Sequence, residues 1–202
     1  MKKGTELELK LGADSPDVLA LVESDEIFCK CKAEELRLSA LYYDFLDGRL
    51  EKEKASLRFR RENEKGKVTF KTGGRNELGV FSRNEWEISA ADIHFGLSAL
   101  RKECVSPLLG DEGDEPVLQT RAEFVRRELV CSWHGAELCM AFDCGWLGGE
   151  DNPFWEIEAE LVSGEEKSLE ELGEYLCKKY SLFYLHESKR ARCEAYRLSH
   201  KG

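Results

Sequence analysis

The sequence predicts an α+β protein in which about eight antiparallel strands close into a β-barrel around a polar tunnel, with helices packed on the outside. Two observations lead to this prediction. Short segments in which charged and apolar residues alternate recur along the 202 residues, and such alternation is typical of strands that bury one face. The charged faces fall into acidic and basic sets, and a closed barrel can turn all of them toward one shared interior.

The first predicted strand lies near the N-terminus, where Glu6, Glu8 and Lys10 alternate with leucines. Two neighbouring carboxylates on one strand face repel each other unless a divalent cation or a basic group lies between them. Taken alone, the segment is typical of a half-buried strand with a solvated polar face. The pattern returns at 83–88 and 155–161, however, which favours a shared polar interior.

A strand with a basic face comes between these acidic ones. In it, Arg58 and Arg60 alternate with apolar residues and should face inward, whereas Arg61 should face outward. Residues 67–71 repeat the basic pattern after a turn predicted at 65–66, so the two strands are expected to form a hairpin. Glutamates suit hard divalent cations, and arginine and lysine suit anionic oxygens. An interior with both fits phosphate chemistry.

The remaining elements follow from helical periodicity, capping signals and turn residues. In chain order we expect a helix after Asp14, a strand at 34–45, a charged link at 47–54, a break at 73–79, a helix at 90–103, an acidic loop at 110–116, a hairpin of 117–133 with 137–146, and a helix at 165–180. The acidic loop is the best candidate for a domain boundary. Strands of the same pattern flank it, so residues 1–202 are expected to form a single domain.

The predicted long hairpin indicates which of its side chains share a face. If its strands pair symmetrically about His134 and Gly135, Arg126 lies opposite Asp143. Directly opposed residues project from the same face of a sheet, so both side chains should face the interior. A slip of one residue in the register would reverse this expectation.

Several short motifs follow one another along the chain in a recognisable order. They are ExExK at 6–10, YYD at 42–44, LRxR at 57–60, TxK at 69–71, RxExE at 83–87, FxR at 124–126, DxG at 143–145, ExExEL at 156–161 and SKxxR at 188–192. The chain thereby resembles the CYTH or triphosphate tunnel metalloenzyme superfamily nearly end to end, and it looks most like the bacterial inorganic tripolyphosphatase branch. Phe45 stands where that family usually has threonine, and Cys193 where it often has glycine. Neither departure removes an implied ligand.

The resemblance implies a site in which basic residues hold triphosphate oxygens and carboxylates hold one or two Mg²⁺ or Mn²⁺ ions. The implied substrate-binding residues are Lys10, Arg58, Arg60, Lys71, Arg83, Arg126, Lys189 and Arg192. The implied metal ligands are Glu6, Glu8, Glu85, Glu87, Asp143, Glu156 and Glu158. Glu8, Lys10 and Lys189 are the implied catalytic residues. Glu160 matches the motif less well and is expected to be structural or to point elsewhere.

The function implied by the resemblance is metal-dependent hydrolysis of a triphosphate by activated water, without a covalent nucleophile. Inorganic tripolyphosphate, cleaved to pyrophosphate and phosphate, is the first expectation. The same tunnel in relatives supports thiamine triphosphatase, class IV adenylate cyclase and RNA triphosphatase activities, which the motifs do not separate. A non-catalytic polyphosphate-binding module is a further alternative. Two acidic strands favour the enzyme, because carboxylates repel a polyanion unless a metal ion intervenes.

The composition limits the expected partners. Charged residues make up 35% of the chain and the formal net charge is −10, which opposes binding to DNA or RNA but not to a small polyanion. No segment approaches the roughly 20 apolar residues of a membrane span. No secretory segment is recognised either, so a cytoplasmic protein with free thiols at its eight cysteines is expected. We expect a monomer or a homodimer.

Overall fold

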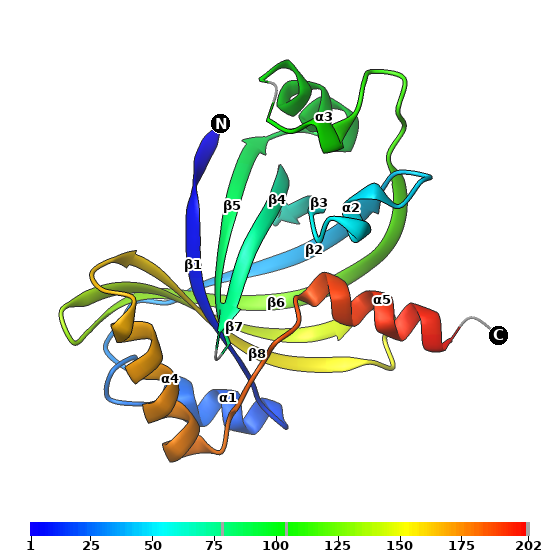
Figure 1. The fold of residues 1–202 in the computed structure, drawn as a ribbon. Coiled ribbons are helices and arrows are strands. Elements are labelled where there is room, and N and C mark those ends of the chain that lie inside the picture. The colour runs from blue at the N-terminus through cyan, green and yellow to red at the C-terminus, as the bar shows by residue number, and fades with distance from the viewer. Residues whose placement is uncertain (78, 104, 201–202) are drawn as a thin grey trace.

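The barrel expected from the charge alternation is present in the computed structural model, which describes residues 1–77, 79–103 and 105–200 (Figure 1). The strands are β1 (Lys2–Gly12), β2 (Glu34–Asp44), β3 (Ser56–Glu62), β4 (Lys65–Glu77), β5 (Val80–Ser89), β6 (Val117–Trp133), β7 (Ala136–Leu147), β8 (Pro153–Ser163) and β9 (Phe183–Tyr184). In this described part of the chain, eight strands run antiparallel in the order β5-β4-β3-β2-β6-β7-β8-β1, and pairing of β1 with β5 closes the sheet. The short β9 pairs with the end of β1.

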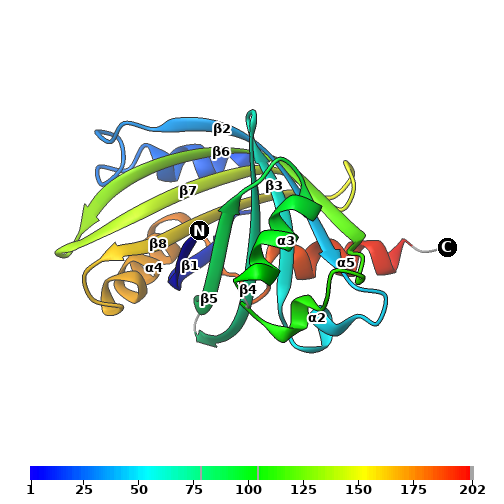
Figure 2. The ribbon, with the colours of Figure 1, turned by 90° about the horizontal axis from the view of Figure 1, so that it is seen from above.

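Helices cover the barrel from outside. They are α1 (Pro16–Glu23), α2 (Arg49–Lys52), α3 (Ile93–Lys102), α4 (Lys167–Tyr180) and α5 (Lys189–Ser199), with a 3₁₀ turn η1 at Pro107–Leu109. α1 and α4 pack together on one flank, α2 and α3 contact the strands β2–β5, and α5 lies on β6 and β7 (Figures 1 and 2). None of the helices among the described residues combines the length and the apolar character needed to cross a bilayer.

The apolar face of β1 forms the larger core. Leu9 and Leu11 are fully buried in one cluster with Leu19 of α1 and with Leu169 and Leu172 of α4. Burial of each leucine side chain contributes about 1.5–3 kcal/mol. Because alternate residues of a strand face opposite ways, this packing fixes the charged side chains of β1 toward the barrel interior.

A second core lies under α3. Ile93, Leu97 and Leu100 of α3 are buried against Leu57 of β3 and Phe70 of β4. Asp92 begins the helix, since its side chain accepts a hydrogen bond from a backbone N–H of the first turn. The apolar side chains of β3 and β4 therefore point outward, and Arg58, Arg60, Lys67 and Lys71 point into the barrel.

The β6–β7 hairpin has the predicted turn and register. His134 and Gly135 both have positive φ, 47° and 83°, as a two-residue turn that matches strand twist requires. The register places Arg126 directly opposite Asp143. The expectation that these two residues share a face is confirmed.

The β3–β4 turn differs from the prediction. It lies at Asn63 and Glu64, and Gly66 lies within β4 opposite Arg61. Asn63 adopts a positive φ of 52°, which asparagine tolerates better than most residues, and its side chain accepts a hydrogen bond from the backbone of Arg37. Gly66 is needed for close packing instead, because a Cβ there would lie 2.3 Å from the carbonyl oxygen of Ala90.

Two helices were not predicted, and the break expected at 73–79 begins later than predicted, because β4 continues to Glu77. α2 lies inside the segment read as a charged link, and α5 begins at the SKxxR motif, where Ser188 accepts a hydrogen bond from the N–H of Ala191. The glycines at 73–74 do not end β4. They accompany a shift of the β4–β5 register between Thr72 and Arg75, after which the pairing continues.

The cysteines agree with the expectation of free thiols as far as the structure describes them. Among the described residues, no cysteine forms a disulfide bond, and Cys104 lies outside the described residues. Cys131 and Cys193 are buried. Burial raises the pKa of each of these two thiols to about 12, so both stay protonated and unreactive at neutral pH.

A buried carboxylate ties α1 to α4 and gives a testable stability prediction. Asp25 accepts hydrogen bonds from the hydroxyls of Tyr175 and Tyr180 and from Lys179, at 3.0, 2.6 and 2.8 Å. Burial opposes ionisation, but Lys179 and the tyrosines outweigh it and lower the pKa of Asp25 to about 2. Because the folded-state pKa lies below the unfolded one, the stabilisation is present above about pH 4 and is lost as the pH falls toward 2.

Asp25→Asn is therefore expected to lower the free energy of unfolding by about 2 kcal/mol at pH 7. The variant should also lose part of the stability change that the wild type shows between pH 4 and pH 2. Urea titrations across this range measure both effects. Glu26→Gln, a charge removal at an exposed neighbour, is the control and should stay close to wild type. Equal pH dependence in the wild type and the Asp25 variant would contradict the role of Asp25.

Candidate active site

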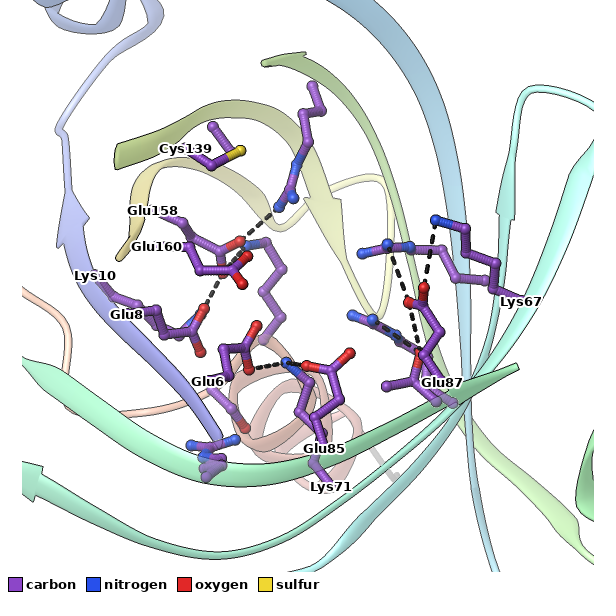
Figure 3. Close-up of a pocket in the computed structure, with 18 of the residues that line it drawn as sticks. Glu6, Glu8, Lys10, Lys67, Lys71, Glu85, Glu87, Cys139, Glu158 and Glu160 are labelled. Carbon is purple, nitrogen blue, oxygen red and sulfur yellow. Dashed lines mark hydrogen bonds and ion pairs between the residues drawn. The ribbon is translucent and has the colours of Figure 1, made fainter. Parts of the chain in front are cut away.

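The barrel encloses a cavity of about 630 Å³ (Figure 3). Nine lysine or arginine residues and eight glutamates belong to its described lining. The interior is thus close to neutral although the whole chain carries a formal charge of −10. A local balance of this kind lets a polyanion enter an otherwise acidic protein.

The cavity collects most of the residues singled out in the sequence. Those that line it are Glu6, Glu8, Lys10, Arg58, Arg60, Lys71, Arg83, Glu85, Glu87, Arg126, Glu158 and Lys189. Three others, Asp143, Glu156 and Arg192, are not among the lining residues. Glu160 also lines the cavity, so of the two alternatives expected for it, a structural role or pointing elsewhere, the second is wrong. Its register partner is Glu8, and directly paired residues share a face.

One end of the cavity is closed by α5 and the other is open. Lys189 and Arg190, at the start of α5, belong to the lining, and Arg190 contacts Asp44 at the end of β2 at 3.3 Å. The side chains of Lys10 and Lys189 are only 6% exposed, whereas that of Lys67 is 29% exposed. Exposure therefore increases from the α5 end toward the mouth.

Lys189 lies in a cluster of three carboxylates at the closed end. Its Nζ is 2.8 Å from Asp143, 2.7 Å from Glu156 and 2.9 Å from Glu158. These carboxylates come from the neighbouring strands β7 and β8, and Asp143 pairs with Glu156 in the ladder. The first turn of α5, fixed by the cap at Ser188, thus delivers an ammonium group to the inner end of the cavity.

Two more cations surround Glu158. Arg126 makes a bidentate pair with Asp143, at 2.7 and 2.8 Å, and its Nη2 is 2.5 Å from Glu158. Lys10 donates to Glu158 and lies 3.0 Å from Glu8. Such charge-assisted bonds hold long side chains in one geometry, so the inner cations are ordered by the carboxylates around them.

These neighbours decide which carboxyl groups are ionised. Burial raises the pKa of Glu158, but Lys10 and the other cations around it outweigh burial and hold that pKa well below its ordinary value. Burial keeps the pKa of Glu156 above its ordinary value, although Lys189 opposes this. Glu158 therefore stays ionised across the physiological range, and Glu156 takes up a proton more readily than its neighbour.

In the middle of the tunnel, Lys71 bridges two strands. Its ammonium group donates to Glu6 of β1 and lies 3.1 Å from Glu85 of β5 (Figure 3). The two carboxylates come together because β1 pairs with β5 at the closure of the barrel. The ammonium lies between carboxylates, as a divalent cation would.

Arg58 and Arg83 differ from the other cations of the tunnel. Within the described part of the chain, neither has a carboxylate within ion-pair distance. Arg58 contacts the hydroxyl of Thr69 at 3.3 Å, and the guanidinium of Arg83 lies 4.8 Å from the centre of the Phe81 ring. The buried Nε atoms of Arg58 and Arg60 also have no hydrogen-bond partner among the described residues. Buried unpaired donors are costly, and anionic oxygens would satisfy them.

Three predicted site residues lie behind the lining. The side chains of Asp143 and Glu156 are fully buried because α5 covers that end of the barrel. Arg192, one turn after Lys189, donates to Glu156. Asp143 and Glu156 therefore hold inner cations of the cavity, and Arg192 holds Glu156.

Five charged lining residues were not predicted to belong to the site: Glu62, Lys67, Glu128, Glu160 and Arg190. Glu62 and Lys67 are two that strand spacing could have identified. The signal was available, since Glu62 follows Arg58 and Arg60 at a spacing of two on β3. Lys67 precedes Thr69 on β4 at the same spacing. Strand periodicity places both on the inward face, but Glu62 lies just after the LRxR motif and Lys67 just before the TxK motif.

The carboxylates suit a hard divalent cation by their chemistry, since Mg²⁺ and Mn²⁺ prefer oxygen ligands. As the side chains lie, however, no three carboxylate, imidazole or thiol groups of the described residues are close enough to hold an ion. The glutamates around Lys10 and Lys71 are bound to ammonium groups instead. A metal ion therefore fits the donor set only if these lysines move.

Solved structures share the fold over almost the whole chain. A protein from Hippeastrum, described as a candidate adenylyl cyclase with a dominant triphosphatase activity, aligns with a TM-score of 0.73 at 23% identity and covers 95% of this chain and 96% of its own. A candidate adenylate cyclase from Bacillus halodurans aligns with a TM-score of 0.58 at 20% identity, covering 95% and 98%. At these identities the likeness concerns the fold.

Sequence comparison is more specific. An inorganic triphosphatase of Haemophilus influenzae is 30% identical over 191 residues, which cover 93% of this chain and 53% of that protein. The chain thus spans about half the length of this curated relative. The sequence profile of the CYTH domain matches residues 4–193. The protein therefore belongs to the CYTH domain family.

Proposed function

We propose that residues 1–202 form a single CYTH domain that hydrolyses a triphosphate, with inorganic tripolyphosphate as the substrate and pyrophosphate and phosphate as the products. The observation that supports this proposal best is the pair of arginines on β3. Arg58 and Arg60 line an enclosed cavity and keep buried Nε donors unpaired among the described residues. Guanidinium groups bind phosphoryl oxygens bidentately.

In this proposal the basic residues bind the substrate at successive depths. Lys10, Lys189 and Arg126 hold the inner end of the phosphate chain, and Arg58, Arg60, Lys71 and Arg83 hold the rest. Arg192 acts through Glu156, which it contacts. Charge-assisted bonds of this type contribute about 1.5–3 kcal/mol each, so several together compensate for the repulsion from the glutamates.

The proposed metal ligands are Glu6, Glu8, Glu85, Glu87 and Glu158 in the cavity, with Asp143 and Glu156 behind it. A Mg²⁺ or Mn²⁺ ion there supplies neutralisation of phosphate charge and a more acidic water. Lys10 and Lys71 leave their carboxylates for phosphoryl oxygens when the polyanion enters. Glu8 orients the attacking water, and Lys10 and Lys189 stabilise charge on the leaving phosphate.

The choice of tripolyphosphate rests on the inorganic triphosphatase of Haemophilus influenzae. Thiamine triphosphate and ATP are the competing substrates, and cyclisation of ATP is the competing reaction. We expect phosphate release from tripolyphosphate to exceed that from the two organic triphosphates at equal concentration. If no phosphate is released from any of the three substrates with any divalent metal, the proposal that the domain is a triphosphatase is refuted.

Removal of metal provides a separate prediction. Chelation of divalent cations is expected to abolish phosphate release, and Mg²⁺ or Mn²⁺ should restore it. Ca²⁺ should inhibit, because its larger and looser coordination shell does not reproduce the octahedral geometry of Mg²⁺. Activity that persists unchanged after exhaustive chelation would exclude the proposed role of the carboxylates.

The ion pairs also favour a second candidate, a non-catalytic polyphosphate-binding module. Lys10, Lys71 and Lys189 are each already bound to carboxylates, as is expected of a site that works without metal. Calorimetric titration with tripolyphosphate separates the two candidates. Tight binding without hydrolysis in any divalent metal supports the module, and metal-dependent turnover supports the enzyme.

A further inference from the structure

Four charged side chains form a cluster at the open mouth of the tunnel, on β3, β4 and β5. The Nζ of Lys67 is 2.9 Å from Glu62 and 3.5 Å from Glu87. Arg60 donates to the same Glu62 and lies 3.9 Å from the same Glu87. The two carboxylates therefore hold a lysine and an arginine side by side at the rim of the cavity. Figure 3 shows Lys67 beside Glu87.

Lys67 is more exposed than the neighbouring cations Arg60 and Lys71. Its side chain is 29% exposed, compared with 13% for Arg60 and 14% for Lys71. It also follows Thr69 and Lys71 outward along the inward face of β4, at the strand spacing of two. The positive lining thus extends further toward solvent on β4 than the sequence motif TxK indicates.

On the opposite side of the mouth, the described lining contains no lysine or arginine beyond Arg126. Beyond Arg126, the described lining on β6, β7 and β8 consists of acidic, apolar and thiol side chains: Glu128, Val130, Cys139, Ala141, Glu160, Leu161 and Val162. Carboxylates and apolar groups repel or fail to solvate a phosphate. Among the described lining residues, the cations that a phosphate chain can meet at the mouth therefore lie on the β3–β4 side.

The ion pairs of Lys67 suit it for binding and contribute little to stability. Partly exposed pairs of this kind are weakened by solvent screening. They do hold the ammonium at the rim, and ordering a lysine beforehand reduces the entropy lost when it binds a ligand. A lysine ammonium carries a full charge at neutral pH.

We infer that Lys67 is a further substrate-binding residue, positioned by Glu62, that contacts the outermost phosphate of a chain bound in the tunnel. This inference rests on the proposed function, because it takes a linear phosphate chain as the ligand. The inner cations hold the first phosphates of the chain. The contribution of Lys67 therefore depends on chain length, being small for pyrophosphate and large for tripolyphosphate.

The test compares Lys67→Gln with Lys65→Gln. Lys65 carries the same charge two residues further out on β4, is exposed and does not line the cavity. Calorimetric titrations with pyrophosphate and with tripolyphosphate give the dissociation constants of each variant. Lys67→Gln should weaken tripolyphosphate binding on the order of tenfold, from one lost charge-assisted contact. It should change pyrophosphate binding less than about threefold, and Lys65→Gln should change neither.

The outcomes separate this inference from the proposed function. Equal weakening of both anions by Lys67→Gln would overturn the outermost contact, and unchanged tripolyphosphate binding would remove Lys67 from the site. An equal loss of tripolyphosphate affinity in the Lys65 variant would show that the effect comes from the net charge of the β3–β4 hairpin and not from a contact of Lys67. A wild-type protein that binds neither anion would refute the proposed function and this inference together, whereas wild-type binding without hydrolysis leaves only the inference standing.

Discussion

Replacing Glu158 by glutamine is expected to lower kcat for tripolyphosphate hydrolysis on the order of a hundredfold or more. The substitution removes one charge with little change in volume. Glu158 is the carboxylate that Lys10, Lys189 and Arg126 share, and its low pKa keeps it ionised. As a metal ligand, Glu158 would hold the positive charge of the ion beside the reacting phosphate, and the variant would lose that charge. Loss of comparable electrostatic stabilisation in other active sites lowers kcat on the order of a hundredfold or more.

The expected change in binding has the opposite sign. Without the charged carboxylate, Lys10, Lys189 and Arg126 lose a competing anion and remain available for phosphate oxygens. Tripolyphosphate should therefore bind to the variant at least as tightly as to the wild type. Partial recovery of activity at high Mg²⁺ or Mn²⁺ would support metal ligation. Glu160→Gln, on the same strand and in the same cavity, should lower kcat much less. Thermal unfolding must show that the variant is folded, because breaking a buried ion pair costs about 3–5 kcal/mol.

Wild-type kcat in Glu158→Gln would remove this residue from the reacting centre. A parallel loss of kcat and of binding affinity would instead indicate that Glu158 only orders the cations. Glu158→Asp separates charge from geometry. It keeps the charge and shortens the side chain, so recovery of binding without turnover would indicate that the position of the carboxylate matters.

The sequence predicted the features that depend on local alternation. Leu9 and Leu11 are buried outside the barrel while Glu8 and Lys10 face inward, because a strand with one apolar face has a single way to bury it. The register of Arg126 with Asp143 could be counted from the turn, since both strands are long and regular. These predictions needed no knowledge of distant contacts.

The features that depend on closure could not be predicted in the same way. Lys71 bridges Glu6 and Glu85 only because β1 pairs with β5. The sequence of neither strand indicates that the two strands pair. The burial of Glu156 likewise depends on α5, which is far from β8 in the sequence. The motifs supplied the inward-facing residues, and the tertiary arrangement decided which of them line the cavity and which support it.

The strongest test of the barrel interior compares two neighbouring arginines of β3. Arg60 lines the cavity, is 13% exposed and is bound to Glu62. Arg61 is exposed on the opposite face and lies along an outer groove beside Arg37 and Asn63. The two residues share charge, size and strand, so they differ mainly in the side of the barrel that they face.

Arg60→Ala is therefore expected to lower kcat/KM for tripolyphosphate by about ten- to a hundredfold, since one charge-assisted phosphate contact contributes roughly 1.5–3 kcal/mol. Arg61→Ala should stay within about twofold of the wild type, because its side chain does not reach the cavity. Steady-state kinetics on both variants measures the difference, and thermal unfolding checks that each is folded. Equal losses in the two variants, or a larger loss at Arg61, would show that substrate does not bind inside the barrel as proposed. The difference between neighbours thus tests the binding site without depending on which triphosphate is the natural substrate.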